Sequence, residues 1–217
     1  FTGINQSNLQ GEVFVDGDLY TSGASSLQAV QWVWHDSTAY IFPDSPSNVQ
    51  IEALEKSGNL HRIFGLEEDT VYQKEVFSLW HNHGVRPTDE KYAYGVFPGV
   101  SREETLALTK KPPIEVLSNN ENLQAIQHIA TERMGFAFHK ITTHPLSKKL
   151  TLSVSDPCLV VIDKKSNTIS VSDPTTKLDE VTVSFERKNG KKNSVTVNLP
   201  DGEYSGQSKT IDLKIKL

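Results

Sequence analysis

Short apolar runs bounded by turn residues recur along the whole chain. Successive runs begin about ten residues apart, a spacing typical of an all-β sandwich or barrel. In the first half they predict strands over residues 12–15, 27–34, 38–42, 48–54, 60–64 (the weakest), 71–80 and 92–97. Asp16-Gly17-Asp18 and His35-Asp36-Ser37 have the composition of tight turns between paired strands.

The second half continues the pattern. It predicts strands over residues 151–154, 158–162, 168–171, 181–185, 194–199 and 211–217. Asp-Pro, Asn-Gly and Pro-Asp-Gly sequences separate these runs and are characteristic of turns. A second, smaller antiparallel β-sandwich is therefore predicted.

One short helix is predicted between the two halves. Ser101 and Glu104 have the spacing of a capping box, in which each side chain bonds to the backbone N–H of the other residue. The helix should run to about Thr109 and end before Pro112-Pro113.

Residues 121–139 carry conflicting signals. Four apolar residues recur at helical spacing: Leu123, Ile126, Ile129 and Ala130. That periodicity by itself favours a helix over residues 121–133. The alternative is one long, bent strand that continues to Phe138.

Charge is distributed unevenly along the chain. Residues 1–113 carry 8 basic and 15 acidic side chains, whereas residues 114–217 carry 14 basic and 12 acidic ones. The change falls beside Lys110-Lys111-Pro112-Pro113, a polar stretch that the prolines stiffen. We therefore predict two domains, residues 1–113 and 114–217.

Composition excludes several classes of protein. No run of about 18 apolar residues is present, so no membrane-spanning helix is predicted. The net charge of −5 argues against nucleic acid as a partner. The one cysteine, Cys158, rules out a disulfide framework and is expected to be an inert core thiol. The chain begins at Phe1 without a signal-peptide pattern, so we expect a processed chain or a piece of a longer one.

Two histidines are the first candidates for chemistry. His81 and His83 lie two residues apart in a predicted strand and therefore share a face. With a carboxylate such as Asp36 they could bind zinc or iron. No third ligand stands at a diagnostic spacing, so we prefer a structural role and assign no metal ligand and no cofactor.

Two further clusters have a chemical and a structural interpretation. His35 and Asp36 could be a base and its orienting carboxylate. The Gly-x-Ser-x-Gly nucleophile motif is absent, so hairpin capping is preferred. Asp16-Gly17-Asp18 could contribute to a calcium site, but without a full EF-hand loop a plain turn is preferred.

Aromatic rings are concentrated in the first half of the chain. They could stack against sugar rings or pack in the core, and core packing is the default interpretation. They are Trp32, Trp34, Trp80, Tyr40, Tyr92 and Tyr94. Trp32 and Trp34 share one face of their predicted strand.

Three groups of segments together resemble one family. They are residues 32–43 (WVWHDSTAYIFP), residues 77–87 with 92–99 (FSLWHNHGVRP and YAYGVFPG), and residues 116–119, 123–125 and 156–158 (VLSN, LQA and DPC). In order and spacing they resemble the β-rich C-terminal part of polysaccharide lyase family 8, nearest to its chondroitin AC lyase branch, which also has hyaluronate and xanthan lyases as relatives.

The resemblance implies an enzyme of three parts: an N-terminal α/α toroid, a central β supersandwich and a small C-terminal β-sandwich. Members are secreted or periplasmic and cleave uronic-acid-containing polysaccharides by β-elimination. The family's catalytic Asn, His, Tyr and Arg lie on the toroid, and its supporting acidic residues and metal site lie early in the supersandwich. All of them would precede Phe1. The resemblance also implies that residues 121–139 are mainly strand.

His35, Asp36, His83 and Tyr92 match motif positions of the family, but these motifs carry no catalytic role that can be transferred. No catalytic, substrate-binding or metal-binding residue is therefore assigned to the chain.

We therefore predict an all-β chain, with residues 1–113 as the C-terminal part of a central β supersandwich and residues 114–217 as a small C-terminal antiparallel β-sandwich. The leading hypothesis is the non-catalytic β portion of an extracellular or periplasmic lyase, inactive alone. Its partners would be an acidic polysaccharide and the missing toroid. The alternatives are a stand-alone carbohydrate-binding β-sandwich and a metal-dependent enzyme built around His81 and His83.

Overall fold

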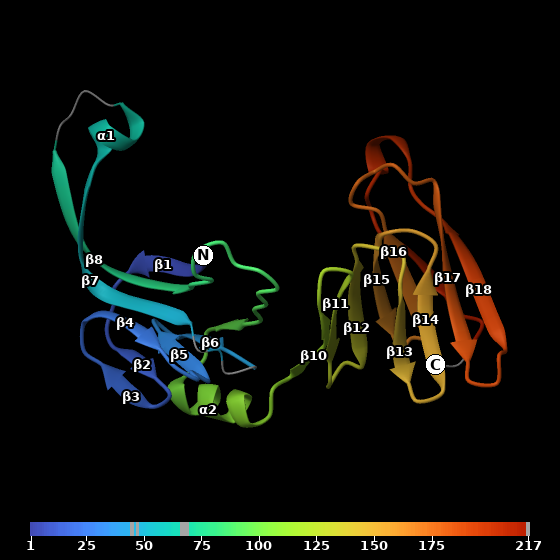
Figure 1. Cartoon of the computed structure of the whole chain (residues 1–217), viewed down its shortest axis with the longest axis horizontal. Coiled ribbons are helices and arrows are strands. Elements are labelled where there is room, and N and C mark those ends of the chain that lie inside the picture. The colour runs from blue at the N-terminus through green and yellow to red at the C-terminus, as the bar shows by residue number, and fades with distance from the viewer. Residues whose placement is uncertain (44–45, 47, 66–69, 216–217) are drawn as a thin grey trace. The chain divides into compact units, whose positions relative to one another are not determined.

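The computed structural model describes residues 1–43, 46, 48–65 and 70–215. It divides into two compact units, Phe1–Pro112 and Pro113–Leu217. Each unit consists of two antiparallel sheets (Figure 1). The predicted all-β fold class is confirmed. No helix among the described residues is long and apolar enough to cross a membrane.

The first unit is built from two sheets, with strand orders β1-β8-β7-β4 and β3-β2-β5-β6-β9. Its elements are β1 (Thr2–Asn8), β2 (Val13–Val15), β3 (Asp18–Tyr20), β4 (Gly23–Leu27), β5 (Trp32–His35), β6 (Thr38–Ile41), β7 (Val49–Asn59), α1 (Leu60–Phe64), β8 (Val71–His81), β9 (Gly95–Pro98) and α2 (Arg102–Lys110).

Alternating residues of these strands join the two sheets through a shared core. Val49 and Ile51 of β7 are fully buried, and Phe77 and Leu79 of β8 pack beside them. Val33 belongs to the same cluster from the five-stranded sheet. Successive side chains of a strand point to opposite faces, so the residues between these positions face away from the core.

Helix α2 packs on the opposite face of the five-stranded sheet. Leu108 of the helix packs against a second cluster that contains Phe14, Trp32 and Ile41. Ser101 and Glu104 form both bonds of the capping box. The predicted helix is therefore confirmed, and the local capping signal located its start correctly.

Three predicted strands in this unit need correction, those over residues 27–34, 92–97 and 60–64. Residues 27–34 are not one strand, because β4 ends at Leu27 in one sheet and β5 begins at Trp32 in the other. Ala29, with φ of 52°, turns the chain between them. Residues 92–94 precede β9 rather than forming part of it. Strands β1 and β3 were not predicted, and β1 is largely polar.

Residues 60–64 form helix α1 instead of the predicted strand. The Asn59 side chain accepts a hydrogen bond from the backbone N–H of Arg62 at 3.1 Å and so caps the helix start. Gly65 ends the helix in the left-handed conformation, with φ of 67°. Two capping residues thus outweighed a weak apolar pattern.

The second unit has a six-stranded sheet, β10-β11-β12-β15-β16-β19, and a four-stranded sheet, β13-β14-β17-β18. Its elements are β10 (Ile114–Asn119), β11 (Leu123–His128), β12 (Arg133–Phe138), β13 (Thr143–Ser147), β14 (Leu150–Val154), β15 (Cys158–Asp163), β16 (Thr168–Ser172), β17 (Glu180–Arg187), β18 (Lys192–Asn198), the 3₁₀ turn η1 (Gly202–Tyr204) and β19 (Lys209–Asp212). Strands β10 and β13 were not predicted.

One core, which includes Leu152, Val160, Ile162 and Phe185, fills the space between these two sheets. The predicted last strand was too long, because β19 ends at Asp212; residues 216–217 lie outside the described part of the chain.

The ambiguous segment is strand, as the family resemblance implied, and the helix favoured by periodicity is wrong. It is also not one bent strand, because β11 and β12 pair as an antiparallel hairpin that turns between His128 and Arg133. Leu123 and Ala125 are buried, while Gln124 and Ile126 are exposed. Ile126 lies on the outer face of the sheet and Leu123 on the inner face, so their helical spacing in the sequence does not reflect a shared buried face.

Candidate functional site

The end of strand β8 brings the sequence candidates of the first unit together. Phe77 and Leu79 face the core, whereas Ser78 and Trp80 face the opposite side of the sheet. His81 returns to the core face and is only 3% exposed. The candidate residues therefore form two separate groups, one on each face of the four-stranded sheet.

The first grouping is a histidine–tyrosine cluster formed by His81, His83, Tyr92 and Tyr94. The rings of His81 and Tyr92 have centroids 5.7 Å apart, and those of His83 and Tyr92 lie 5.6 Å apart. Tyr92 and Tyr94 are stacked at 6.3 Å. Since the tyrosines come from the segment before β9, these ring contacts tie that segment to the end of β8.

His83 fastens the same region to strand β1. Oγ1 of Thr2 lies 2.8 Å from Nε2 of His83, and a carboxylate oxygen of Glu90 lies 4.0 Å from its Nδ1. His81 is more isolated, because its buried Nε2 has no hydrogen-bond partner among the described residues. Burial, helped by the nearby His83, lowers the pKa of His81 below its ordinary value of 6.5.

These contacts favour the structural interpretation of the two histidines. Within the described residues, no group of three or more His, Cys, Asp and Glu side chains is placed to hold a metal ion. The contacts of His81 and His83 are with aromatic rings, a threonine hydroxyl and one distant carboxylate. Among the described residues, His81 and His83 thus lack a third side chain that could complete a metal site with them.

His35 and Asp36 do not form a base and its orienting group. Nε2 of His35 accepts a hydrogen bond from the backbone N–H of Gln10 at 3.1 Å, and the ring lies 4.4 Å from that of Phe77. Burial lowers the pKa of His35, against the opposing effect of Asp36. Asp36, with φ of 46°, occupies the hairpin turn between β5 and β6. These contacts favour the structural interpretation of the pair.

Asp16 is likewise a turn residue. Its carboxylate accepts hydrogen bonds from the backbone N–H groups of Gln31 and Trp32, at 3.0 and 2.8 Å for Oδ1. These bonds fix the start of β5 against the β2–β3 turn. The carboxylate is thus committed to backbone donors, which favours the plain turn over a calcium ligand.

Two of the three tryptophans are part of the core. Trp32 is 5% exposed, and Trp34 packs beside Phe14 with ring centroids 6.1 Å apart. The indole Nε1–H of Trp34 donates to the carbonyl of Val100 at 2.8 Å. Tyr40 is also buried. The expected aromatic face exists, but α2 and its neighbours pack against it.

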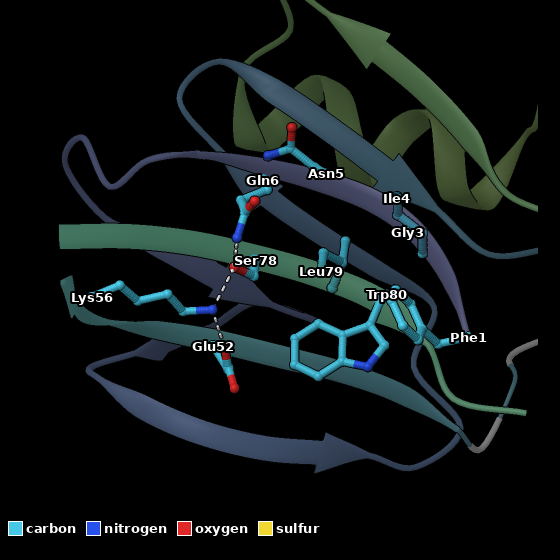
Figure 2. A pocket seen from close by; sticks show the side chains of 10 residues that line it. All are labelled: Phe1, Gly3, Ile4, Asn5, Gln6, Glu52, Lys56, Ser78, Leu79 and Trp80. Atoms are coloured by element: carbon cyan, nitrogen blue, oxygen red, sulfur yellow. Dashed lines mark hydrogen bonds and ion pairs between the residues drawn. The ribbon is translucent and has the colours of Figure 1, made fainter. Parts of the chain in front are cut away.

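Trp80 is the exception, because it lines an open pocket on the outer face of the four-stranded sheet. The pocket has a volume of about 620 Å³. We call it the Trp80 groove and define it by the lining residues Gly3, Gln6, Glu52, Lys56, Ser78 and Trp80 (Figure 2). They come from β1, β7 and β8, three adjacent strands of one sheet.

A short polar network crosses the groove. Lys56 pairs with Glu52 and donates to Oγ of Ser78 at 3.3 Å. The amide of Gln6 lies 3.5 Å from the same hydroxyl oxygen. In Figure 2 this network lies beside the indole of Trp80. The groove therefore combines two aromatic side chains, those of Trp80 and Phe1, with an ammonium, a carboxylate and an amide.

Sequence reasoning missed the polar residues of the groove. The available signal was the alternation along residues 48–54, which places Glu52 on the face opposite Ile51. That signal could not show that β1 pairs with β8 and adds Gln6 to the same surface.

The fold and the groove define the molecule as a tandem β-sandwich protein. Comparison with known proteins is more specific. Residues 1–109 match the super-sandwich domain of polysaccharide lyase family 8, and residues 115–182 match the C-terminal β-sandwich domain of that family. The chain belongs to polysaccharide lyase family 8.

Individual relatives agree with this family. Chondroitinase-AC of Pedobacter heparinus is 30% identical over 98% of the chain, and a hyaluronate lyase of Thermasporomyces composti is 29% identical over 77% of it. A solved structure of chondroitinase AC lyase superimposes with a TM-score of 0.87 at 27% identity and covers 96% of the chain. A Paenibacillus xanthan lyase shares the fold, with a TM-score of 0.74 at 17% identity over 84% of the chain.

The matches cover only part of each relative. The chain spans 31% of the Pedobacter protein and 22% of the Thermasporomyces protein. It likewise spans 32% of the chondroitinase AC structure and 19% of the xanthan lyase structure.

Proposed function

We propose that the chain is the non-catalytic β portion of an extracellular or periplasmic lyase that cleaves a uronic-acid-containing polysaccharide of the chondroitin or hyaluronan type by β-elimination. The observation that carries this proposal is the match of both units to consecutive domains of one lyase family. The catalytic groups would lie on polypeptide outside the 217 residues, since the relatives are three or more times longer.

The chemistry of β-elimination supports this division of labour. A base must remove the proton at C5 of the uronate, and a cation or hydrogen-bond donor must stabilise the developing negative charge. The buried histidines do not suit the first role, because His81 lies inside the cluster and His35 accepts a hydrogen bond from Gln10. His83 and Tyr92 lie together, with ring centroids 5.6 Å apart, and the contacts of His83 with Thr2 and Glu90 tie its ring to the surrounding fold.

The assay of the proposed function follows the unsaturated uronate that β-elimination leaves on the product, by its ultraviolet absorbance. The purified 217-residue chain should give no product with chondroitin or hyaluronan. A longer protein that contains the same residues and the preceding polypeptide should give a steady rise. Product formation by the 217-residue chain that disappears in His83→Ala or Tyr92→Phe would overturn the assignment of catalysis to other polypeptide.

A further inference from the structure

The Trp80 groove is not explained by the core or by the histidine–tyrosine cluster. Its volume of about 620 Å³ lies within the range of small-molecule sites, roughly 300–1,000 Å³. It combines an aromatic surface with convergent polar groups, which is the usual composition of such sites.

We propose that the Trp80 groove is a non-catalytic binding site for an acidic polysaccharide, in which a hexosamine ring stacks on Trp80 and the carboxylate of a neighbouring uronate binds Lys56. The choice of polysaccharide rests on the proposed function, whereas the site itself rests on the geometry of the groove.

Open space beside Trp80 leaves room for a sugar ring. Gly3 of β1 is the cross-strand partner of Trp80, and a Cβ built at Gly3 would meet nothing within 4 Å. Both residues line the groove. A pyranose ring has an apolar face of C–H bonds. When this face packs against an indole, the contact is stabilised by the apolar area removed from water and by the attraction of the C–H bonds to the negative face of the indole.

The polar side of the groove has an excess of positive charge. Lys74 is the cross-strand partner of Lys56, so the two ammonium groups project from the same face of the sheet. Of the residues that line the groove, Glu52 carries a carboxylate that offsets them. An anionic group is therefore attracted to this end of the groove, although the first half of the chain is acidic overall.

The polar network also places the ammonium group of Lys56 beside Ser78, which lies two residues before Trp80 on β8. The hydroxyl of Ser78 holds Nζ of Lys56, and Ser78 precedes Trp80 on the same face. This separation is about 7 Å along the strand. It suits two adjacent rings of one chain, with the neutral ring on the indole. The Gln6 amide can both donate to and accept from sugar hydroxyl or acetamido groups.

Binding is tested by calorimetry on the intact 217-residue chain, without turnover. The probes are a chondroitin hexasaccharide and a neutral N-acetylglucosamine oligomer of the same length. The chondroitin probe should bind more tightly, and added salt should weaken its binding selectively, because the difference depends on charge.

Four variants then locate the site. Trp80→Ala should weaken binding of both probes about tenfold. Trp80→Phe should retain most of the affinity and shows that the fold is intact. Lys56→Gln should weaken only the chondroitin probe, about two- to fivefold. Gly3→Leu removes no group but fills the open space, and it should weaken both probes.

Matched controls lie outside the groove. Gly135→Leu introduces the same side chain at a glycine of the second unit, where a Cβ would meet only Ile126 at 3.7 Å, and Tyr204→Ala removes an exposed aromatic ring from that unit. Both should bind as the unmodified chain does. Failure of the folded chain to bind either probe, or unchanged binding in Trp80→Ala and Gly3→Leu, would overturn the proposal. These readouts are independent of lyase activity, so failure here is distinguishable from failure of the proposed function.

Discussion

The imidazole rings of His81 and His83 lie 6.0 Å apart and nearly parallel, at an angle of 17°. One ring is buried against Phe42, and the other is hydrogen-bonded to strand β1 through Thr2. Burial disfavours a positive charge on the His81 ring, and the nearby His83 adds to this effect.

Acid should therefore destabilise the first unit through His81. Its pKa is lowered in the folded state, so as the pH falls below 6.5 the unfolded chain takes up a proton that the folded chain resists, and the free energy of unfolding decreases. His81→Phe should reduce this decrease between pH 7 and 5, as measured by urea unfolding. Burial also lowers the pKa of His35, so part of the decrease in the free energy of unfolding should remain in His81→Phe. The exposed substitution His61→Gln is the control, and a pH dependence unchanged in His81→Phe would contradict the prediction.

Asp173 should be important for the second unit. It is 2% exposed, and its carboxylate accepts hydrogen bonds from the backbone N–H groups of Thr175, Lys177 and Leu178 at 2.8, 2.8 and 3.0 Å. Burial alone would raise its pKa, but these bonds and the Thr175 hydroxyl outweigh burial and hold the pKa at about 2. Asp173→Ala leaves the donors unpaired and should lower the free energy of unfolding by about 2–4 kcal/mol.

The same carboxylate predicts an acid limit for this unit. Because the folded-state pKa lies below the ordinary value of 3.8, its stabilising contribution is present above pH 3.8 and is lost as the pH falls towards 2. Asp173→Asn should be less sensitive to pH over that interval in thermal unfolding. Asp201→Asn, at an exposed position, should leave both stability and pH dependence unchanged.

The capping box should contribute measurably to the attachment of helix α2. Ser101→Ala removes the acceptor for the backbone N–H of Glu104 and should cost about 1 kcal/mol in chemical denaturation. Glu103→Gln, in the same helical turn but outside the box, is the matched control. Equal stability of Ser101→Ala and the unmodified chain would show that contacts of the helix with the sheet suffice to fix its start.

Cys158 should be unreactive in the folded chain. Burial, with the negative charges of Asp156 and Asp173, raises its pKa to about 12, so the thiolate is scarce at neutral pH. A thiol reagent at pH 8 should label the chain only after guanidinium denaturation. Since this is the one cysteine of the sequence, rapid labelling of the native chain could come from no other thiol.

Local chemistry was sufficient to predict many elements. The Ser101–Glu104 capping box defined α2, and short apolar runs between turn residues predicted strands β14, β15 and β17. In each of these cases the signal lies within the element itself. The same local rules failed at residues 60–64, where the flanking Asn59 and Gly65 determined the helix.

The sequence by itself determined the all-β class and the turns at Asp16 and His35–Ser37, because each depends on residues close together in the chain. Only the tertiary structure decided that residues 27–34 divide between two sheets and that residues 123–138 fold as a hairpin. It also separated Trp32 and Trp34 in the core from Trp80 in a groove. The physical reason is that these outcomes depend on which distant strand lies alongside. The pairing of β1 with β8 places Gly3 beside Trp80 and Thr2 beside His83, and periodicity within a single strand contains no information about such a partner.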